Sequence, residues 1–438
     1  MRALMNRKNA SMGMAAVLAL ATLGVVPAVQ AANATWTGTT DATWQTGTNW
    51  NPAPAPGSTA VTTSTDIATF NINSHLTVTP DANRNLGSIN FDTAAGNFVI
   101  GTTGGNPLFL TTGGTTQILS TLTATNAIET INAPLVLEGA TYTFTNASAN
   151  GAGANAGTLN FGGGITGAAG NTVLTLAGAN TNSNTISGVI GNGSATSMGI
   201  TKSGAGTWLL AGANTYTGPT NITAGTLAFQ TQASLYTGNS TNWTAANITV
   251  ASGATMALQV SANPAYFTST ALDTLLDGSH LGASTATTGL TAGAILGLDT
   301  TQGDFTYNTA IASTNSIVLK KLGANVLTLG GANTYTGTTT VSAGAVLISG
   351  SGTLGATTAA VTLAGGSIDL GTTTQTVGAV SINNAAGIGN TLQNGTLTGT
   401  SYTGANTSGN AIVTTNLGGT GSTLTENGYE FSGRILYI

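Results

Sequence analysis

Four aspartates are the residues of this chain whose type and spacing could serve acid–base chemistry. Asp273 and Asp277 are four positions apart, and Asp299 and Asp304 are five positions apart. A pair of carboxylates that flanks a glycosidic bond can supply the acid and the base of polysaccharide cleavage. Aspartates spaced in this way are far more often solvated residues of helices and loops. We therefore expect no catalytic residue among them.

The sequence offers even fewer candidate residues for binding a metal ion or a phosphate group. The chain has two histidines, His75 and His280, and no cysteine, whereas a catalytic zinc usually takes three protein ligands. The run Gly162-Gly163-Gly164 lacks the Gly-Lys-Ser/Thr ending of a phosphate-binding loop. The sequence predicts no metal site, no cofactor and no enzyme activity.

The composition is that of a chain built from many short strands. Of its 438 residues, 5% are charged, 41% are hydrophobic and 62 are glycine. Val, Ile, Leu and Thr alternate with Gly, Asn, Ser and Ala, a pattern typical of strands joined by tight turns. Charged residues are too few to cover the wet faces of amphipathic helices. We therefore predict an all-β fold.

Residues 1–31 have the features of a secretory signal peptide. Positive residues precede a short apolar run, and Val29-Gln30-Ala31 offers small residues for cleavage after Ala31. The run is shorter than the ~20 apolar residues of a membrane span, so we expect a partner in the export machinery and no membrane span in the mature chain. Cleavage removes three basic residues, which leaves 8 − 3 = 5 against 13 acidic ones, a net charge of −8. That balance argues against nucleic acid as a partner.

The segment 32–70 holds three of the five tryptophans, namely Trp36, Trp44 and Trp50. These rings could cover the open N-terminal end of a stack of repeats. They could instead form an aromatic platform that contacts glycans. Burial is the commoner fate of clustered tryptophans, so we favour an N-terminal cap.

Short apolar strands recur every 8–12 residues or so through 71–230, for example at Ser88–Phe91, Leu108–Leu110 and Leu135–Leu137. Such spacing fits a sandwich, a barrel or a solenoid. An internal repeat decides among them, because residues 202–227 and 321–346 align without a gap at an offset of 321 − 202 = 119. Self-similarity of this kind marks a stacked architecture. We predict a right-handed parallel β-helix, with the second clear repeat in 316–348.

Each copy contains an alternating strand followed by corner residues. After the strand Val326–Leu329, Gly331 and Asn333 are expected to bend the chain in left-handed conformations, and asparagines at equal corners are expected to stack into ladders. The predicted corner residues are Gly212, Asn214, Tyr216, Gly218 and Gly225 in the first copy, and Gly331, Asn333, Tyr335, Gly337 and Gly344 in the second.

Two segments depart from the repeat pattern. Residues 231–315 read as one insertion or as irregular coils, with a short helix from Ala265 to Leu276 that has Pro264 in its first turn and ends at Asp277-Gly278. Residues 349–438 read as C-terminal coils and a cap that includes the apolar stretch Tyr429–Ile438.

The blocks Lys202–Gly218 and Gly331–Gly337 resemble the autotransporter-associated β-strand repeat, also called the passenger-associated transport repeat. Their specific part is Gly-Ala-Asn-Thr-Tyr-Thr-Gly, at 212–218 and 331–337. The resemblance implies a parallel β-helix passenger with a role in surface display, adhesion or transport across the outer membrane. It implies no shared active site, since the repeat is a scaffold element. We do not expect the C-terminal β-barrel of such proteins in the 438 − 348 = 90 residues after Ile348, which are rich in Gly, Thr and Asn.

We therefore expect a secreted or surface-exposed protein, associated with the outer membrane of a Gram-negative-type bacterium. Its role would be structural or adhesive and non-catalytic. Its partners would be extracellular polysaccharide or the surface of a host or neighbouring cell. The alternative is a β-helix protein that binds or cleaves polysaccharide, suggested by the Trp-rich opening and the acidic insertion.

Overall fold

The fold was analysed in a computed structural model. The structure describes residues 33–425, except for 60–62, 152, 154, 313–316, 385–388, 407–411 and 419–423. The predicted signal peptide and the predicted C-terminal stretch Tyr429–Ile438 lie outside the described residues. All the described residues belong to one compact unit.

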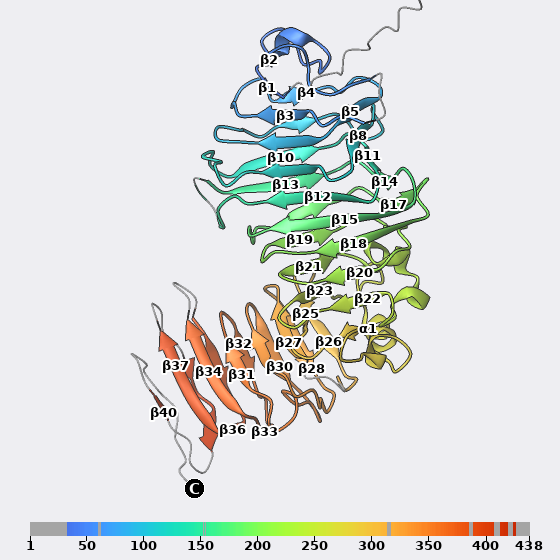
Figure 1. The fold of residues 1–438 in the computed structure, drawn as a ribbon. Coiled ribbons are helices and arrows are strands. Elements are labelled where there is room, and N and C mark those ends of the chain that lie inside the picture. The colour runs from blue at the N-terminus through green and yellow to red at the C-terminus, as the bar shows by residue number, and fades with distance from the viewer. Residues whose placement is uncertain are drawn as a thin grey trace, which may run out of the picture. The chain divides into compact units, whose positions relative to one another are not determined.

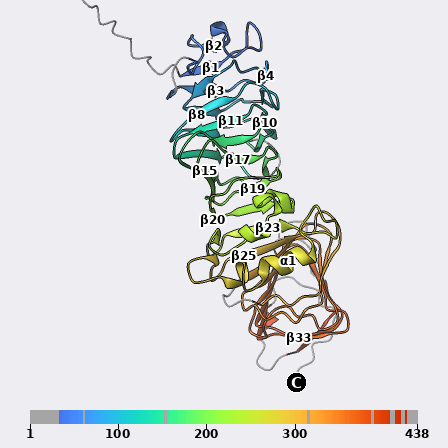
Figure 2. The ribbon, with the colours of Figure 1, turned by 90° about the vertical axis from the view of Figure 1, so that its right-hand side faces the viewer.

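Short strands stacked in parallel build the unit, coil after coil (Figures 1 and 2). The described strands form five sheets, and each strand pairs with the equivalent strand of the next coil. The antiparallel exception is β1 with β2. The predicted all-β fold, a parallel β-helix, is confirmed.

Two sheets carry most of the strands. The 11-stranded sheet has the order β2 (Trp50–Asn51), β1 (Ala34–Trp36), β3 (Ile67–Phe70), β6 (Ser88–Phe91), β9 (Thr115–Ile118), β12 (Thr141–Asn146), β15 (Asn171–Gly178), β18 (Ser197–Lys202), β20 (Thr220–Ile222), β22 (Ile248–Val250), β24 (Gly289–Leu290). The 15-stranded sheet has the order β4 (Thr77–Val78), β7 (Val99–Ile100), β10 (Ala127–Ile131), β13 (Gly157–Phe161), β16 (Asn184–Ile186), β19 (Thr207–Leu210), β21 (Thr226–Phe229), β23 (Thr255–Gln259), β25 (Ile295–Asp299), β27 (Val318–Leu322), β29 (Thr339–Val341), β31 (Val361–Leu363), β34 (Ala379–Asn384), β37 (Ser401–Asn406), β40 (Leu424–Thr425).

Three smaller sheets complete the coils. The five-stranded sheet contains β5 (Arg84–Leu86), β8 (Leu108–Thr111), β11 (Leu135–Glu138), β14 (Ile165–Gly167) and β17 (Ile190–Gly193). The six-stranded sheet contains β26 (Phe305–Tyr307), β28 (Val326–Leu329), β30 (Ala345–Ile348), β32 (Ser367–Asp369), β35 (Thr391–Gln393) and β38 (Ile412–Val413). The three-stranded sheet contains β33 (Thr374–Thr376), β36 (Thr396–Thr398) and β39 (Asn416–Gly418).

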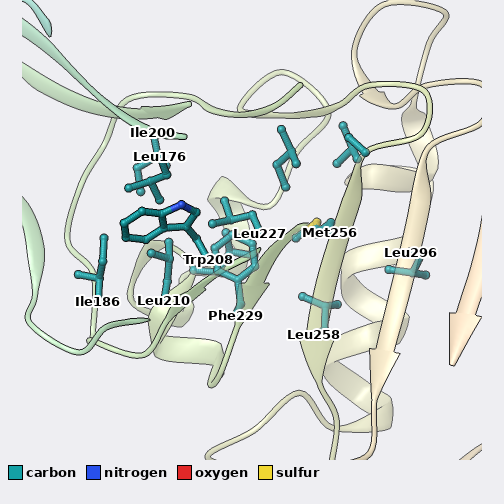
Figure 3. Packing of buried hydrophobic residues seen from close by; sticks show 14 of the residues in the cluster. Leu176, Ile186, Ile200, Trp208, Leu210, Leu227, Phe229, Met256, Leu258 and Leu296 are labelled. Carbon is teal, nitrogen blue, oxygen red and sulfur yellow. The ribbon is translucent and has the colours of Figure 1, made fainter. Parts of the chain in front are cut away.

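The core runs inside the coils, because alternate side chains of each strand point inward. Phe144 and Phe161 stack with ring centroids 4.0 Å apart, and Trp208 lies 6.2 Å from Phe161. Figure 3 shows Trp208 packed among aliphatic side chains, including Leu210 of its own strand and Leu176 of the preceding coil. Burial of this apolar interior is the main source of stability in a chain without disulfides.

Most helical segments lie in two loops of the region 231–315, whose strands β22 to β26 continue the sheets. The first loop contains the 3₁₀ turns η2 (Gln232–Ser234), η3 (Tyr236–Gly238) and η4 (Ser240–Asn242). The second contains α1 (Ser269–Leu276) and η5 (Leu281–Ala283), and a further turn, η1 (Gly47–Asn49), lies near the N-terminus. No helix among the described residues is long and apolar enough to cross a membrane.

Helix α1 begins four residues later than predicted. The hydroxyl of Thr268 accepts the N–H of Ala271 and caps the first turn. The preceding residues are held elsewhere, because Phe267 forms a parallel bridge with Val260 and the side chain of Asn263 accepts the N–H of Ala265. Pro264 therefore lies in a turn before the helix.

Candidate functional site

The structure does not bring Asp273 and Asp277 together as a catalytic pair. Asp277 ends the helix with an extended backbone (φ −70°, ψ 167°), and its carboxylate lies 2.7 Å from Nδ1 of His280. That contact, with the N–H of Ser279, holds the pKa of Asp277 below its usual value. Burial raises the pKa of Tyr307, and a hydrogen bond to Asp273 raises it further. The pair of acids is thus split between two different partners.

Asp299 and Asp304 are occupied by the backbone around them. Asp299 accepts the N–H (2.9 Å) and the hydroxyl (2.6 Å) of Thr301, and Asp304 accepts the N–H of Val326 at 2.8 Å. Asp299 thus closes a local turn, whereas Asp304 joins its coil to the next one. In the described part of the chain, no group of three or more His, Asp and Glu side chains could hold a metal ion.

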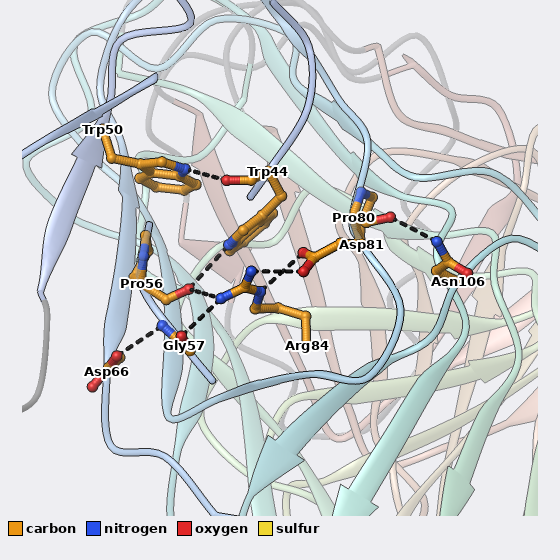
Figure 4. Close-up of polar contacts among 9 residues, drawn as sticks. All are labelled: Trp44, Trp50, Pro56, Gly57, Asp66, Pro80, Asp81, Arg84 and Asn106. Carbon is orange, nitrogen blue, oxygen red and sulfur yellow. Dashed lines mark hydrogen bonds and ion pairs between the residues drawn. The ribbon is translucent and has the colours of Figure 1, made fainter. Parts of the chain in front are cut away.

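The three tryptophans of the N-terminal segment are buried. Trp36 and Trp44 are 0% exposed and Trp50 is 3% exposed. The indole of Trp44 donates to the carbonyl of Pro56 at 3.0 Å, and that of Trp50 donates to the carbonyl of Trp44 at 2.7 Å (Figure 4). The hypothesis of a glycan-stacking platform at these rings is wrong for this fold, since no ring face reaches solvent.

The N-terminal segment also covers the first strand of three sheets. Strand β2 pairs with β1 at the edge of the 11-stranded sheet. Thr43 bridges Thr79 just after β4, and Ser58 bridges Asn85 in β5. Uncovered edges offer unpaired backbone groups to other chains, so the segment closes both the apolar interior and the exposed ladders.

A buried ion pair anchors this segment to the stack. Arg84 is 6% exposed, and it contacts Asp81 through Nη2 at 2.7 Å. Its Nη1 donates to the carbonyl of Gly57 at 2.7 Å and to that of Pro56 at 3.3 Å (Figure 4). Sequence reasoning did not single out this arginine, which holds the proline-rich turn against β5.

Asn214 and Asn333 occupy equivalent places and each joins three coils. Asn333 accepts the N–H of Ile311 at 2.8 Å, and its amide donates to the carbonyl of Thr353 at 2.7 Å. Asn214 accepts the N–H of Ile190 at 2.9 Å and donates to the carbonyl of Ser234 at 2.8 Å. The predicted ladder of stacked asparagines is absent at these two positions, because both side chains bond to the backbone of the coils on either side.

The corner tyrosines are buried and paired with threonines of the next strand. The hydroxyls of Tyr216 and Thr220 lie 2.8 Å apart, and those of Tyr335 and Thr339 lie 2.7 Å apart. Burial raises the pKa of both tyrosines well above the usual value. Their hydroxyls are therefore neutral hydrogen-bonding groups of the interior.

Each repeat begins with a buried lysine that sequence reasoning missed. Lys202 is 0% exposed and its Nζ donates to the carbonyls of Ser203, Gly204 and Ala224 at 2.8, 2.7 and 3.1 Å. Lys321 makes the equivalent three contacts with Leu322, Gly323 and Ala343. Burial lowers the pKa of both lysines to about 8. The sequence did contain a signal for this burial: each lysine stands at a position of its strand where the alternation of inward and outward side chains directs it inward.

The glycines of the corners serve two different purposes. Gly225 (φ 65°) and Gly344 (φ 64°) adopt the left-handed conformation, which favours glycine. Gly331 and Asn333 do not, which corrects the prediction for them. A Cβ on Gly331 would lie 2.5 Å from the carbonyl of Thr309 in the preceding coil. Gly331 is thus required by the close approach of two coils, and Gly212, Gly218 and Gly337 face the same crowding.

Each copy of the repeat spans two stacked coils. Thr207 pairs with Thr226 in the first copy, and Val326 pairs with Ala345 in the second. The first copy lies in the 11- and 15-stranded sheets, whereas the second lies in the 15- and six-stranded sheets. The same sequence therefore serves two different combinations of sheets.

A buried carboxyl in the core also escaped sequence reasoning. Glu129 in β10 is 0% exposed, and its Oε2 accepts the N–H of Phe98 at 3.0 Å. Among the described residues, none hydrogen bonds to its Oε1. Burial raises the pKa of Glu129 to about 8.

Comparison with known proteins agrees with the repeat geometry. The Passenger-associated-transport-repeat family matches residues 200–229 and 319–348, which hold the two pairs of stacked coils. The chain is 46% identical over 54 residues to the adhesin BmaC autotransporter of Brucella suis biovar 1 (strain 1330). That match spans 12% of this chain and 2% of the adhesin. No solved structure matches the chain. The chain thus carries two copies of the passenger-associated transport repeat, both built into its parallel β-helix.

Proposed function

We propose that this chain is an exported, non-catalytic adhesive protein, displayed at the surface of a Gram-negative-type bacterium or released from it. The observation that carries the proposal is the pair of repeats, and a 54-residue similarity to an autotransporter adhesin supports it. In this chain the repeats form buried scaffold, because Asn214, Tyr216 and Lys202 all point into the coils. Adhesion would then use the outward side chains that the scaffold presents.

The local contacts of the acids support a non-catalytic role. Each of the four aspartates has its own partner. Asp277 contacts Ser279 and His280, and Asp273 contacts Tyr307. Asp299 contacts Thr301, and Asp304 contacts Val326. Acid–base cleavage needs two carboxyls that face one bond. Nothing in these contacts favours the polysaccharide-cleaving alternative.

Adhesion can be tested with beads that carry the purified, exported chain. We expect such beads to remain on cell monolayers or polysaccharide-coated glass under flow, several-fold more often than beads carrying the same chain after denaturation. Equal retention of both beads on every surface would contradict the proposal. In parallel, a polysaccharide panel should release no reducing ends, whereas cleavage that Asp273→Asn abolishes would establish the enzymatic alternative.

A further inference from the structure

The outward face of the 11-stranded sheet carries an unbroken column of small polar side chains. Register pairs Thr115 with Thr143, Thr143 with Thr175, and Thr175 with Thr201. The column continues through Asn221 to Thr249, and Ser88 precedes Thr115 in the adjoining strand. We call this column the hydroxyl face: Ser88, Thr115, Thr143, Thr175, Thr201, Asn221 and Thr249, all partly exposed.

Most hydroxyls of this face are free to bind. The hydroxyls of Thr220 and Thr339, which point inward, are used by Tyr216 and Tyr335. On the hydroxyl face, Thr115 lies 3.4 Å from the hydroxyl of Ser88. In the described part of the chain, the other threonine hydroxyls of the face make no hydrogen bond within the protein. Each can therefore donate one hydrogen bond and accept others.

The spacing and stiffness of the column favour a repeating partner. Neighbouring strands lie ~4.8 Å apart, so the hydroxyls recur at that interval along seven strands. Threonine is β-branched and its χ1 angle is restricted, so little side-chain entropy is lost on binding. Several weak contacts to one long polymer act together, because the first contact raises the local concentration of the next.

Charge indicates that this partner is neutral. The outward positions of β6, β9, β12, β15, β18, β20 and β22 hold no Asp, Glu, Lys or Arg. Elsewhere in the described residues, Arg84, Lys202 and Lys321 are buried, and Lys320 is half-buried. An anionic polymer would find no exposed cation on this face, and a cationic one would find no carboxylate.

The chemistry of the face also disfavours a protein partner. Hot spots of protein interfaces are enriched in Trp, Tyr and Arg, and none of these is an outward residue of the seven strands. The apolar outward side chains there are Val173 and Ala177 in β15. A polymer rich in hydroxyls, which both donate and accept hydrogen bonds, complements the face better than an apolar surface does.

We propose that the hydroxyl face binds an extended, uncharged polysaccharide along the direction of the stack. The inference rests on the proposed adhesive function and names both the surface and the class of ligand. The 15-stranded sheet offers a natural comparison, because its outward column is interrupted by Val99, Leu209 and Lys320.

The test compares two matched fourfold variants of the exported chain. The first is Thr115→Val, Thr143→Val, Thr175→Val and Thr201→Val, which keeps the β-branched shape and removes four hydroxyls. The control is Thr130→Val, Thr158→Val, Thr340→Val and Thr362→Val, at partly exposed outward positions of the 15-stranded sheet. Circular dichroism and thermal unfolding establish that both variants fold.

Binding is measured by pull-down with cellulose, curdlan and mannan as neutral probes, and with alginate and heparin as anionic ones. We expect the unsubstituted chain to bind at least one neutral probe, the face variant to lose affinity by at least about tenfold, and the control to bind normally. Preference for an anionic probe, equal losses in both variants, or no binding to any neutral probe would overturn the inference.

Two further readouts separate this inference from the adhesive function. If beads with the face variant adhere to cells as well as beads with the unsubstituted chain, adhesion stands and the hydroxyl face is not its site. If sedimentation reveals self-association that only the face variant loses, the face binds a second copy and the polysaccharide inference fails. Beads that adhere to nothing would refute the adhesive function itself.

Discussion

The side chain of Asn333 accepts the N–H of Ile311 in the preceding coil at 2.8 Å, and Asn214 does the same for Ile190 at 2.9 Å. Ile190 begins the last strand of the five-stranded sheet. The backbone N–H of Thr215 donates to the carbonyl of Ile190 at 2.8 Å. The segment Gly-Ala-Asn-Thr-Tyr-Thr-Gly thus covers the end of that sheet where no further strand follows.

Asn333→Ala should therefore destabilise the fold by about 2–4 kcal/mol, because it leaves the N–H of Ile311 and the carbonyl of Thr353 buried without partners. Urea unfolding measures the change. The neighbouring Thr334→Ala is the control, since Thr334 is exposed and its backbone bond to Ile311 remains. It should cost less than about 0.5 kcal/mol, and equal losses in the two variants would contradict the role given to Asn333.

Glu129 predicts a dependence of stability on pH. Its pKa is about 8 in the folded protein, compared with an ordinary value of 4.5. Between pH 4.5 and about 8, the folded state therefore holds a proton on Glu129 that the unfolded state releases. The free energy of unfolding should fall as pH rises through this window, by at most about 1.4 kcal/mol per pH unit. Glu129→Gln should remove most of that slope. Asp92→Asn should leave it unchanged, because the pKa of Asp92 is lowered by its hydrogen bonds to threonines and its titration lies at acid pH.

The burial of the basic residues predicts resistance to trypsin. Arg84, Lys202 and Lys321 are buried and Lys320 is half-buried, so the folded chain should be cut in the described region only through unfolding. Ser279→Arg places a cleavage site in an exposed turn and serves as the control, which should be cut at once near residue 279. Rapid cutting of the unsubstituted chain at Lys202, as judged by mass spectrometry, would show that the repeat is not packed in this way.

The N-terminal cap predicts an aggregation phenotype. Trp44→Ala removes a fully buried indole, which should cost about 3–5 kcal/mol. It should also loosen the bridge from Thr43 to Thr79 and expose strand edges. Thr39→Ala, at an exposed position of the same segment, should change little. Light scattering on warming should rise earlier for Trp44→Ala alone, and coincident curves would argue against a capping role.

Alternation along the strands made much of the fold predictable. Ser88–Phe91 and Val326–Leu329 are strands with the predicted bounds, because apolar residues at every second position specify one buried face. The burial of Trp44 was also favoured in advance. These features depend on neighbours along the chain or on hydrophobicity alone.

The roles of the corner residues depend on neighbouring coils and were not predictable in the same way. From the sequence, Gly331 is interpreted as a flexible corner. A glycine is required there because the backbone of Thr309, 22 residues earlier (331 − 309 = 22), leaves no room for a Cβ. Lys202 reads as a surface charge, yet three carbonyls from two coils enclose its ammonium group. Which two sheets receive the strands of each repeat copy depends on where the five-stranded sheet ends. No local sequence pattern specifies that point.

The most direct test of the central claim, that each repeat is two stacked parallel coils, is a cross-link between strands in a chain that has no cysteine of its own. Thr328 and Leu347 are paired in register on the outer side of β28 and β30. The double variant Thr328→Cys/Leu347→Cys should form a disulfide on mild oxidation, detected by mass spectrometry. Thr306→Cys/Leu347→Cys places the cysteines two coils apart and should not. Failure of the first pair to cross-link, or equal cross-linking of both pairs, would contradict the account.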